Sequence, residues 1–283
     1  MHPILIPGPL PIYSYGVFLG LSCVLGAHLA VWLCERGGVE RARAWWFTLI
    51  VIAVGIVGGR VHDVIVNARP IAELFQLVHS GRTAYGAFLS ATLAAVVASR
   101  LLAVPFWRFG DAAAPTMALG LALTRIGCFL AGCDYGVECE PPWGVRFPPT
   151  SPAWQDQGLV DLTQPSRPVF PVQLLESVLS AGITAALLWL WHRRPRREGA
   201  VLLGFFALYG LVRAGMEQLR GDSGRGELAG LSTSTTIGLI TAGVAAAMYL
   251  PPLARLRPEA GPILDLAPPA PPAQGAAKGA PAK

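Results

Sequence analysis

The apolar residues of this chain are gathered into long blocks that are separated by short polar connections. Each block is about 20 residues long, which is the length that crosses a hydrocarbon core of about 30 Å as a helix. Charged residues make up 14% of the chain, against about a quarter in soluble domains. The pattern argues against a soluble enzyme and predicts an all-α polytopic membrane protein with seven transmembrane helices, at Ser14–Cys34, Trp45–Asn67, Ala84–Leu102, Ala112–Gly132, Val172–Trp191, Ala200–Leu219 and Leu231–Leu250.

Two regions depart from this membrane pattern. The connection between helices four and five, residues 133–169, contains Pro, Asp and Glu together with Trp143, Phe147 and Trp154. It is long for a connection within a compact bundle, so we expect a structured extracytoplasmic loop. Residues 251–283 are rich in Pro, Ala and Gly and cannot build a packed core. We therefore expect a membrane domain over residues 1–250, followed by a disordered cytoplasmic tail.

The arginines predict the orientation of the chain in the membrane. Eleven of them fall in the connections after helices one, three, five and seven, and six fall on the alternate side. Because short cytoplasmic loops carry an excess of Lys and Arg, the N-terminus is expected outside and the C-terminus in the cytoplasm. The arginines are spread over short connections and helix ends instead of one surface, so nucleic acid is not an expected partner.

The most informative residues are ionisable groups inside the apolar blocks. A charge near the bilayer centre costs at least about 2.5 kcal/mol, which makes it a functional candidate. Arg60 and Arg125 interrupt the second and fourth blocks. The sixth block contains polar residues spaced by four, four and three, which would share one helical face: Tyr209, Arg213, Glu217 and Arg220.

The charges of this helical face predict an anion site. Arg213 and Arg220 stand against the single carboxylate of Glu217, which leaves one positive charge uncompensated. Guanidinium groups suit phosphate oxygens because they donate two parallel hydrogen bonds. Inside a membrane, the natural ligand is an anionic lipid head group. The alternative interpretation is a structural Arg–Glu pair that neutralises itself.

Several short motifs lie in a fixed order along the blocks, at His2–Gly16, Gly58–Arg60, Asp111–Pro115, Arg125–Gly136, Pro142–Pro148, Arg167–Glu176 and Tyr209–Arg220. Their order and their placement resemble the prolipoprotein diacylglyceryl transferases over nearly the whole membrane region. The resemblance implies an enzyme of the bacterial inner membrane that needs no cofactor and no metal. Its partners would be phosphatidylglycerol, lipobox-containing prolipoprotein precursors and membrane lipid.

The implied reaction moves the diacylglyceryl group of phosphatidylglycerol to the thiol of the lipobox cysteine and releases glycerol phosphate. Fixed cations in a dry site stabilise a leaving group whose charge grows in the transition state. By this resemblance Arg125 and Arg213 bind the phosphate, Tyr209 donates a hydrogen bond, and Glu217 orients Arg213. Glycines at the site would let the backbone approach the lipid closely. The substrate-binding residues implied are Arg60, Gly127, Gly132, Tyr135, Gly136, Gln173, Glu176 and Arg220.

The chain also departs from the family pattern. Tyr85 stands where the family has the histidine proposed to handle the thiol proton, and we expect Tyr85 to position the substrate instead of acting as the base. Cys128, Ala131 and Cys133 replace two asparagines and a glutamate of the signature. A disulfide between Cys133 and Cys139 would be possible at an oxidising outer face. Zinc is not expected, because no histidine lies close by.

Two alternatives to a transferase remain at this point. The first is a divergent member that binds lipid, or uses its cysteines for redox chemistry, without transferring anything. The second is a small-anion transporter whose arginines line a pathway. Transporters often contain inverted repeats and discontinuous helices, and neither is evident in this sequence.

Overall fold

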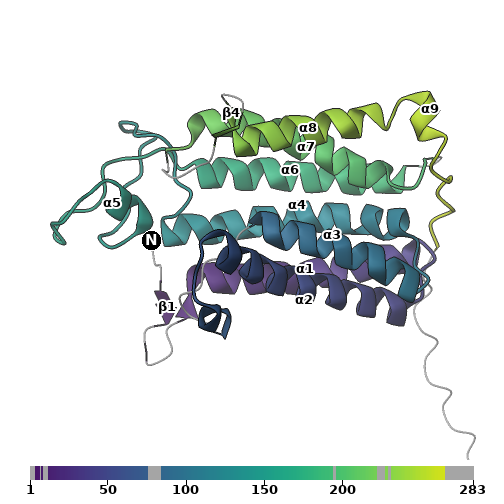
Figure 1. Cartoon of the computed structure of the whole chain (residues 1–283). Helices are drawn as coiled ribbons and strands as arrows, with labels where there is room; N and C mark the ends of the chain where they lie inside the picture. Colours follow the sequence, from purple (N-terminus) through teal and green to yellow (C-terminus); the bar gives the residue numbers. More distant parts are fainter. Residues whose placement is uncertain are drawn as a thin grey trace, which may run out of the picture.

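The computed structural model describes residues 4–6, 8, 12–75, 84–193, 196–221, 227–228 and 231–264. Long helices lying side by side form its body (Figure 1). They are α1 Ser14–Arg36, α2 Arg41–Val66, α3 Ala84–Leu101, α4 Phe106–Ala131, α6 Val172–His192, α7 Ala200–Met216 and α8 Thr233–Ala247.

The shorter elements lie at the ends of the long helices. Two are single-turn α-helices, α5 Pro152–Asp156 and α9 Pro251–Ala254, and two are 3₁₀ helices, η1 Ile71–Phe75 and η2 Glu217–Leu219. Two small antiparallel hairpins pair β1 Ile4–Ile6 with β2 Ile12–Tyr13, and β3 Glu227–Leu228 with β4 Leu231–Ser232.

The long helices give the chain the character of a polytopic membrane protein. Among the described residues, five helices are long and apolar enough to cross a membrane, namely α1, α2, α4, α6 and the stretch from α7 to Leu219. The apolar parts of α3 and α8 are shorter. At 1.5 Å per residue, the 15 residues of α8 rise about 22 Å, which is less than the core of about 30 Å. The predicted count of seven spans therefore stays a prediction.

Helix α4 is the centre of the bundle, because α1, α6 and α7 all pack against it, whereas α2 pairs mainly with α3 and α8 with α7. Small residues allow the peripheral pairs to approach closely. A Cβ atom on Gly58 of α2 would lie 2.0 Å from the Ser90 Oγ of α3, and one on Gly210 of α7 would lie 2.4 Å from the Gly238 carbonyl of α8. Larger side chains at these positions would push the helices apart.

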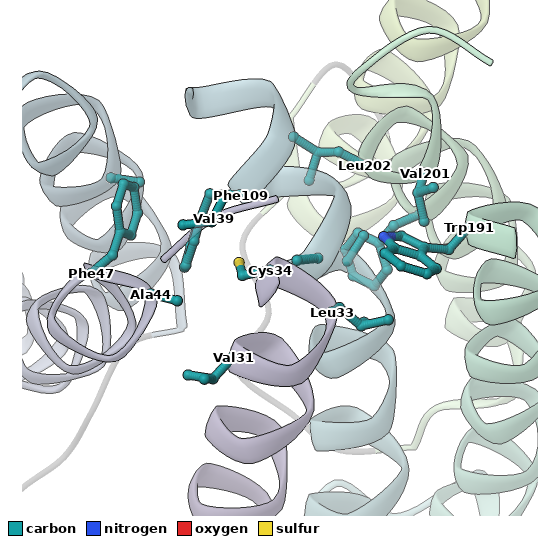
Figure 2. Close-up of a cluster of buried hydrophobic side chains, with 14 of the residues drawn as sticks. Val31, Leu33, Cys34, Val39, Ala44, Phe47, Phe109, Trp191, Val201 and Leu202 are labelled. Atoms are coloured by element: carbon teal, nitrogen blue, oxygen red, sulfur yellow. The ribbon is translucent and has the colours of Figure 1, made fainter. Parts of the chain in front are cut away.

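The main apolar core lies where α1 ends and α2 begins (Figure 2). Phe47 of α2 stacks on Phe109 of α4 with ring centroids 3.8 Å apart. Leu33 of α1, Trp191 of α6 and Leu202 of α7 complete this core. Elsewhere the outer faces of the helices carry exposed apolar side chains, as expected for helices that face lipid.

Buried polar groups stabilise the connection between α6 and α7, at the end of the bundle that contains the main apolar core. Asp111 of α4 accepts hydrogen bonds from the backbone N–H groups of Val201 and Leu202 and forms an ion pair with Arg196. Glu198 pairs with Arg108 at 2.7 Å. Each buried carboxylate therefore has a guanidinium partner, which offsets the cost of burying its charge.

The segment 251–264 packs against the same end of the bundle, although we expected disorder from residue 251 onward. Arg257 is buried and donates to the carbonyls of Glu198 and Met248. The Ala260 N–H donates to the Arg196 carbonyl, and the Leu264 N–H to the Arg36 carbonyl. One arginine and several backbone bonds thus order a segment whose Pro and Ala content predicted none. The rest of the predicted tail, 265–283, lies outside the described residues.

Residues 133–171 form a compact, largely non-helical unit at the opposite end of the bundle (Figure 1). Phe147, Ala153, Val169 and Tyr135 form its small core. Val145 and Val169 exchange two backbone hydrogen bonds, and the Trp154 Nε1–H donates to the Gln164 carbonyl. The folding of this unit fixes the stretch of chain that follows α4.

Candidate functional site

The end of α4 returns the chain toward the bundle. Gly132 caps α4 in the left-handed conformation, at φ 81°. A Cβ atom there would lie 2.9 Å from Phe147, so both the turn and the close approach require glycine. The turn places Asp134 against Arg125, one of the arginines predicted from the apolar blocks.

Arg125 lies between two carboxylates. Its Nη1 is 2.7 Å from the Asp134 Oδ2, and its Nε is 3.0 Å from the Glu176 Oε2 of α6. Glu176 is almost fully buried, at 2% exposed. Because an unpaired charge in such surroundings would cost several kcal/mol, these contacts fix the guanidinium in one orientation.

Asp134 joins Arg125 to a second predicted residue, Arg220. The Arg220 Nη2 lies 2.6 Å from the Asp134 Oδ1, and Gly136 and Arg220 form a backbone bridge. Burial opposes ionisation of this carboxyl, but Arg125 and Arg220 outweigh burial and lower the pKa of Asp134 to about 2. Asp134 is therefore ionised at neutral pH. Sequence reasoning missed it as a site residue, although it stands inside the signature motif.

The polar face of the sixth apolar block is shorter than the spacing predicted. Helix α7 ends at Met216 and continues as the 3₁₀ helix η2. A 3₁₀ turn has three residues per turn, so the face does not run unbroken to Arg220, which turns toward Asp134 instead. This corrects the expectation that the four polar residues share one α-helical face.

The remaining polar residues of this helix include the predicted pair of Arg213 and Glu217. The Arg213 Nη2 lies 3.2 Å from the Glu217 Oε2 and donates to the Ser234 Oγ of α8 at 3.0 Å. The Tyr209 hydroxyl donates to the Glu176 Oε1 at 3.4 Å. Glu176 thereby connects Tyr209 with Arg125.

The charge count of the site also differs from the prediction. The residues Arg125, Arg213 and Arg220 stand against Asp134, Glu176 and Glu217. The positive charge that seemed uncompensated is thus balanced in this network. An anionic ligand must use guanidinium N–H groups that the carboxylates leave open.

The three predicted site glycines face protein atoms. A Cβ atom on Gly127 would lie 3.0 Å from Phe18 and 3.2 Å from the Tyr15 Cα of α1. One on Gly136 would lie 2.5 Å from the Phe170 carbonyl, and Gly132 meets Phe147 as described above. These glycines let one chain segment approach another. Their predicted contact with the lipid stays a prediction.

Other predicted residues have positions that the structure describes. Gln173 is fully buried and donates to the Cys133 carbonyl at 2.8 Å, which ties α6 to the turn after α4. The Tyr135 hydroxyl donates to Asp156 at 3.0 Å, within the unit 133–171. Tyr85 lies in the first turn of α3 with 42% of its surface exposed. Arg60 lies on α2, close to the α3 contact. Their predicted roles stay predictions.

All five cysteines are free thiols, so Cys133 and Cys139 do not form the disulfide considered above. Cys128 donates to the Asp134 Oδ2 at 3.3 Å. The ligand atoms of Cys128, Cys133 and Asp134 all lie within 4.8 Å of one another. Both Asp134 oxygens already contact guanidinium groups, and these cations would repel a metal ion. The cluster fits an ion-pair network better than a metal centre.

The sequence profile of the family described as "Prolipoprotein diacylglyceryl transferase" matches residues 3–250. The chain belongs to the prolipoprotein diacylglyceryl transferase family. The resemblance based on the motifs is therefore confirmed, and the site described above lies within the matched part of the chain.

Curated relatives carry the full name phosphatidylglycerol–prolipoprotein diacylglyceryl transferase. The protein of Clostridium tetani is 29% identical, over 82% of this chain and 90% of its own length. That of Symbiobacterium thermophilum is 30% identical, over 76% and 80%. A second enzyme of this name from Clostridium perfringens is 27% identical, over 81% and 87%. Their names support a transferase of lipoprotein biosynthesis.

Proposed function

We propose that this chain transfers the diacylglyceryl group of phosphatidylglycerol to the lipobox cysteine thiol of prolipoprotein precursors. The observation that carries the proposal is the buried network around Arg125, in a member of this transferase family. A guanidinium held by two carboxylates is preorganised, so it need not reorient when charge develops on a leaving phosphate. A reaction in which a phosphate leaves thus suits a network that holds a guanidinium in a fixed position.

Open donors for the phosphate remain in the network. A guanidinium has five N–H donors. The Arg213 Nη1 is buried and has no hydrogen-bond acceptor among the described residues. A phosphate oxygen would satisfy it, while Glu217 and Ser234 hold the rest of the side chain in place. Arg213 and Arg125 are accordingly proposed as the phosphate-binding pair, with Tyr209 and Glu176 supporting Arg125.

The proposed transfer breaks one C–O bond and forms one C–S bond. The thiol sulfur attacks the glyceryl carbon that carries the phosphate, and the phosphate departs with the electron pair of the C–O bond. The thiol proton goes to water or to the departing phosphate. The sequence has no histidine at position 85 to accept it, because Tyr85 stands there.

The release of glycerol phosphate tests this proposal. Purified protein with phosphatidylglycerol and a lipobox peptide should release one glycerol phosphate for each peptide that is lipidated. Phosphatidylethanolamine in place of phosphatidylglycerol should give neither lipidated peptide nor its own leaving group, phosphoethanolamine. Peptide lipidation without glycerol phosphate would contradict the proposed leaving group.

Replacing Tyr85 by phenylalanine should lower turnover modestly, by about fivefold, and leave the pH profile of the rate unchanged. A phenol with a reference pKa of about 10 is a poor base at neutral pH, so the loss would be that of one positioning hydrogen bond of about 1 kcal/mol. Steady-state rates between pH 6 and 9 would measure this. A loss above roughly a hundredfold with a displaced acid limb would identify Tyr85 as the base.

The proposed topology has seven spans, with the N-terminus outside the bacterial inner membrane and the C-terminus in the cytoplasm. The excess of arginines in the connections on one side supports the orientation, and the long apolar helices support a chain that crosses the membrane several times. In it, residues 133–169 form the extracytoplasmic loop of a membrane domain over 1–250, and the tail is cytoplasmic. The site would then lie near the face on which exported precursors arrive.

Cysteine accessibility measures this topology. In a background without the native cysteines, Gln155→Cys should react with a membrane-impermeant maleimide in intact cells. Arg193→Cys should react only after permeabilisation. Both positions are exposed, so burial does not limit either reaction. The reversed pattern would contradict the orientation.

A further inference from the structure

A cavity lies between α1 and α2, far from the transfer site. Its volume is about 460 Å³, and its lining residues are His28, Leu29, Val31, Trp32, Glu35, Arg41 and Trp45. Cavities that bind small molecules span roughly 300–1,000 Å³. Tyr15, at the start of α1, contacts Gly127 near the transfer site. His28 to Glu35 lie about 20–30 Å further along the same helix.

Side-chain contacts give this cavity a defined apolar part. The His28 ring meets the Trp45 ring edge-on with centroids 5.1 Å apart, and the His28 Nδ1 bonds to the Val24 carbonyl at 2.8 Å. The Arg36 guanidinium lies over the Trp32 ring at 4.2 Å. These contacts hold both indole rings and the imidazole in place along the cavity.

The rim of the cavity carries one negative and one positive group. The Glu35 Oε2 and the Arg41 Nη1 are 3.4 Å apart, with side chains 14% and 69% exposed. This long and partly exposed ion pair contributes little by itself, so its two groups are able to separate around a ligand. Glu35 stands two helical turns from His28, about 10 Å along α1. The cavity is thus charged at its rim and apolar in its depth.

We propose that this cavity binds a phospholipid with an ammonium head group. The phosphate would form an ion pair with Arg41, the ammonium would form one with Glu35, and an acyl chain would lie against Leu29 and Trp45. A zwitterionic head group satisfies both rim charges, whereas an anionic head group that binds Arg41 supplies no cation to Glu35. The apolar faces next to the cavity are exposed at Val24 and Trp46, which gives a lipid access from the side.

This site is separate from the proposed transfer reaction, and the test must show that separation. The probes are phosphatidylethanolamine and phosphatidylglycerol, each with a photoreactive diazirine on one acyl chain, in nanodiscs of otherwise identical phospholipid. After irradiation, labelled peptides that contain Leu29 and Trp45 are quantified by mass spectrometry. The ethanolamine probe should label these peptides about fivefold more than the glycerol probe.

Three variants separate a built site from general lipid contact. Glu35→Gln should abolish the preference between the two probes. Leu29→Trp should fill the cavity and remove most of the labelling by both. The matched control, Leu49→Trp, adds the same bulk at an exposed position of α2 outside the lining and should leave labelling unchanged. Leu29→Trp should also retain the rate of lipid transfer, which shows that the protein is folded.

The proposal is overturned by either of two results. Equal labelling by both probes in the unaltered protein would mean that the rim does not select an ammonium head group. Labelling that survives Leu29→Trp would mean that the probes react from bulk lipid outside the cavity.

Discussion

Replacing Arg125 by alanine should lower the rate of diacylglyceryl transfer on the order of 10²–10³-fold, which is typical when one donor to a developing oxyanion is removed. The protein should still insert and fold, although with a lower unfolding temperature, because each carboxylate that loses Arg125 keeps a hydrogen-bond partner but Glu176 loses its guanidinium. Asp134 retains Arg220, and Glu176 retains Tyr209. Transfer rates and the unfolding temperature in detergent would be measured together.

Arg125→Lys is the matched variant, because lysine keeps the positive charge but lacks the planar guanidinium with its several N–H donors. Arg125 contacts Glu176 and Asp134 through two different nitrogens, and a single ammonium cannot reproduce both contacts and still reach a phosphate. We therefore expect poor rescue, within about tenfold of the alanine variant. Full activity in Arg125→Ala would remove the residue from the site.

Replacing Asp134 by alanine should lower the free energy of unfolding by about 3 kcal/mol. Removing one partner of a buried ion pair typically costs about 3–5 kcal/mol. We expect the lower value, because the Asp134 side chain is 34% exposed and water screens part of the loss. Arg220, whose side chain is 5% exposed, would lose its ion pair with Asp134. Denaturant unfolding in detergent measures the change.

The effect of Asp134 should depend on pH in a defined direction. Its folded pKa of about 2 is below the ordinary value of 3.8, so its stabilisation is fully present above about pH 4 and is lost as the pH falls through 2. The stability gap to Asp134→Ala should thus be constant from pH 5 to 8 and narrow toward pH 2. Glu140→Ala, at an exposed position of the same unit, should change stability by less than about 0.5 kcal/mol. Equal effects of the two variants would contradict the buried network.

Hydrophobic length and helical spacing predicted the helices and part of the site. Each of the predicted apolar blocks contains a helix, because about 20 apolar residues have few other stable conformations in a membrane. The i,i+4 spacing correctly predicted that Arg213 pairs with Glu217. Both inferences depend on local periodicity, which a single sequence displays directly.

The long-range pairs could not be predicted in this way. Asp134 and Arg220 are 86 residues apart in the sequence, and they meet because Gly132 reverses the chain and the 3₁₀ helix η2 turns Arg220 toward α4. Arg257 is buried through contacts with backbone carbonyls, which no pattern of side chains records. The charge balance of the site follows from these distant partners, and for that reason counting charges along one helix overestimated its positive charge.

The most direct test of the proposed transfer is the covalent product. Purified protein would be incubated with phosphatidylglycerol labelled in its diacylglyceryl part and a lipobox peptide, and the peptide would be analysed by mass spectrometry. We predict a thioether-linked diacylglyceryl peptide that disappears when the peptide cysteine is replaced by serine. Absence of the product from folded protein that binds phosphatidylglycerol would contradict transfer and leave a lipid-binding member of the family.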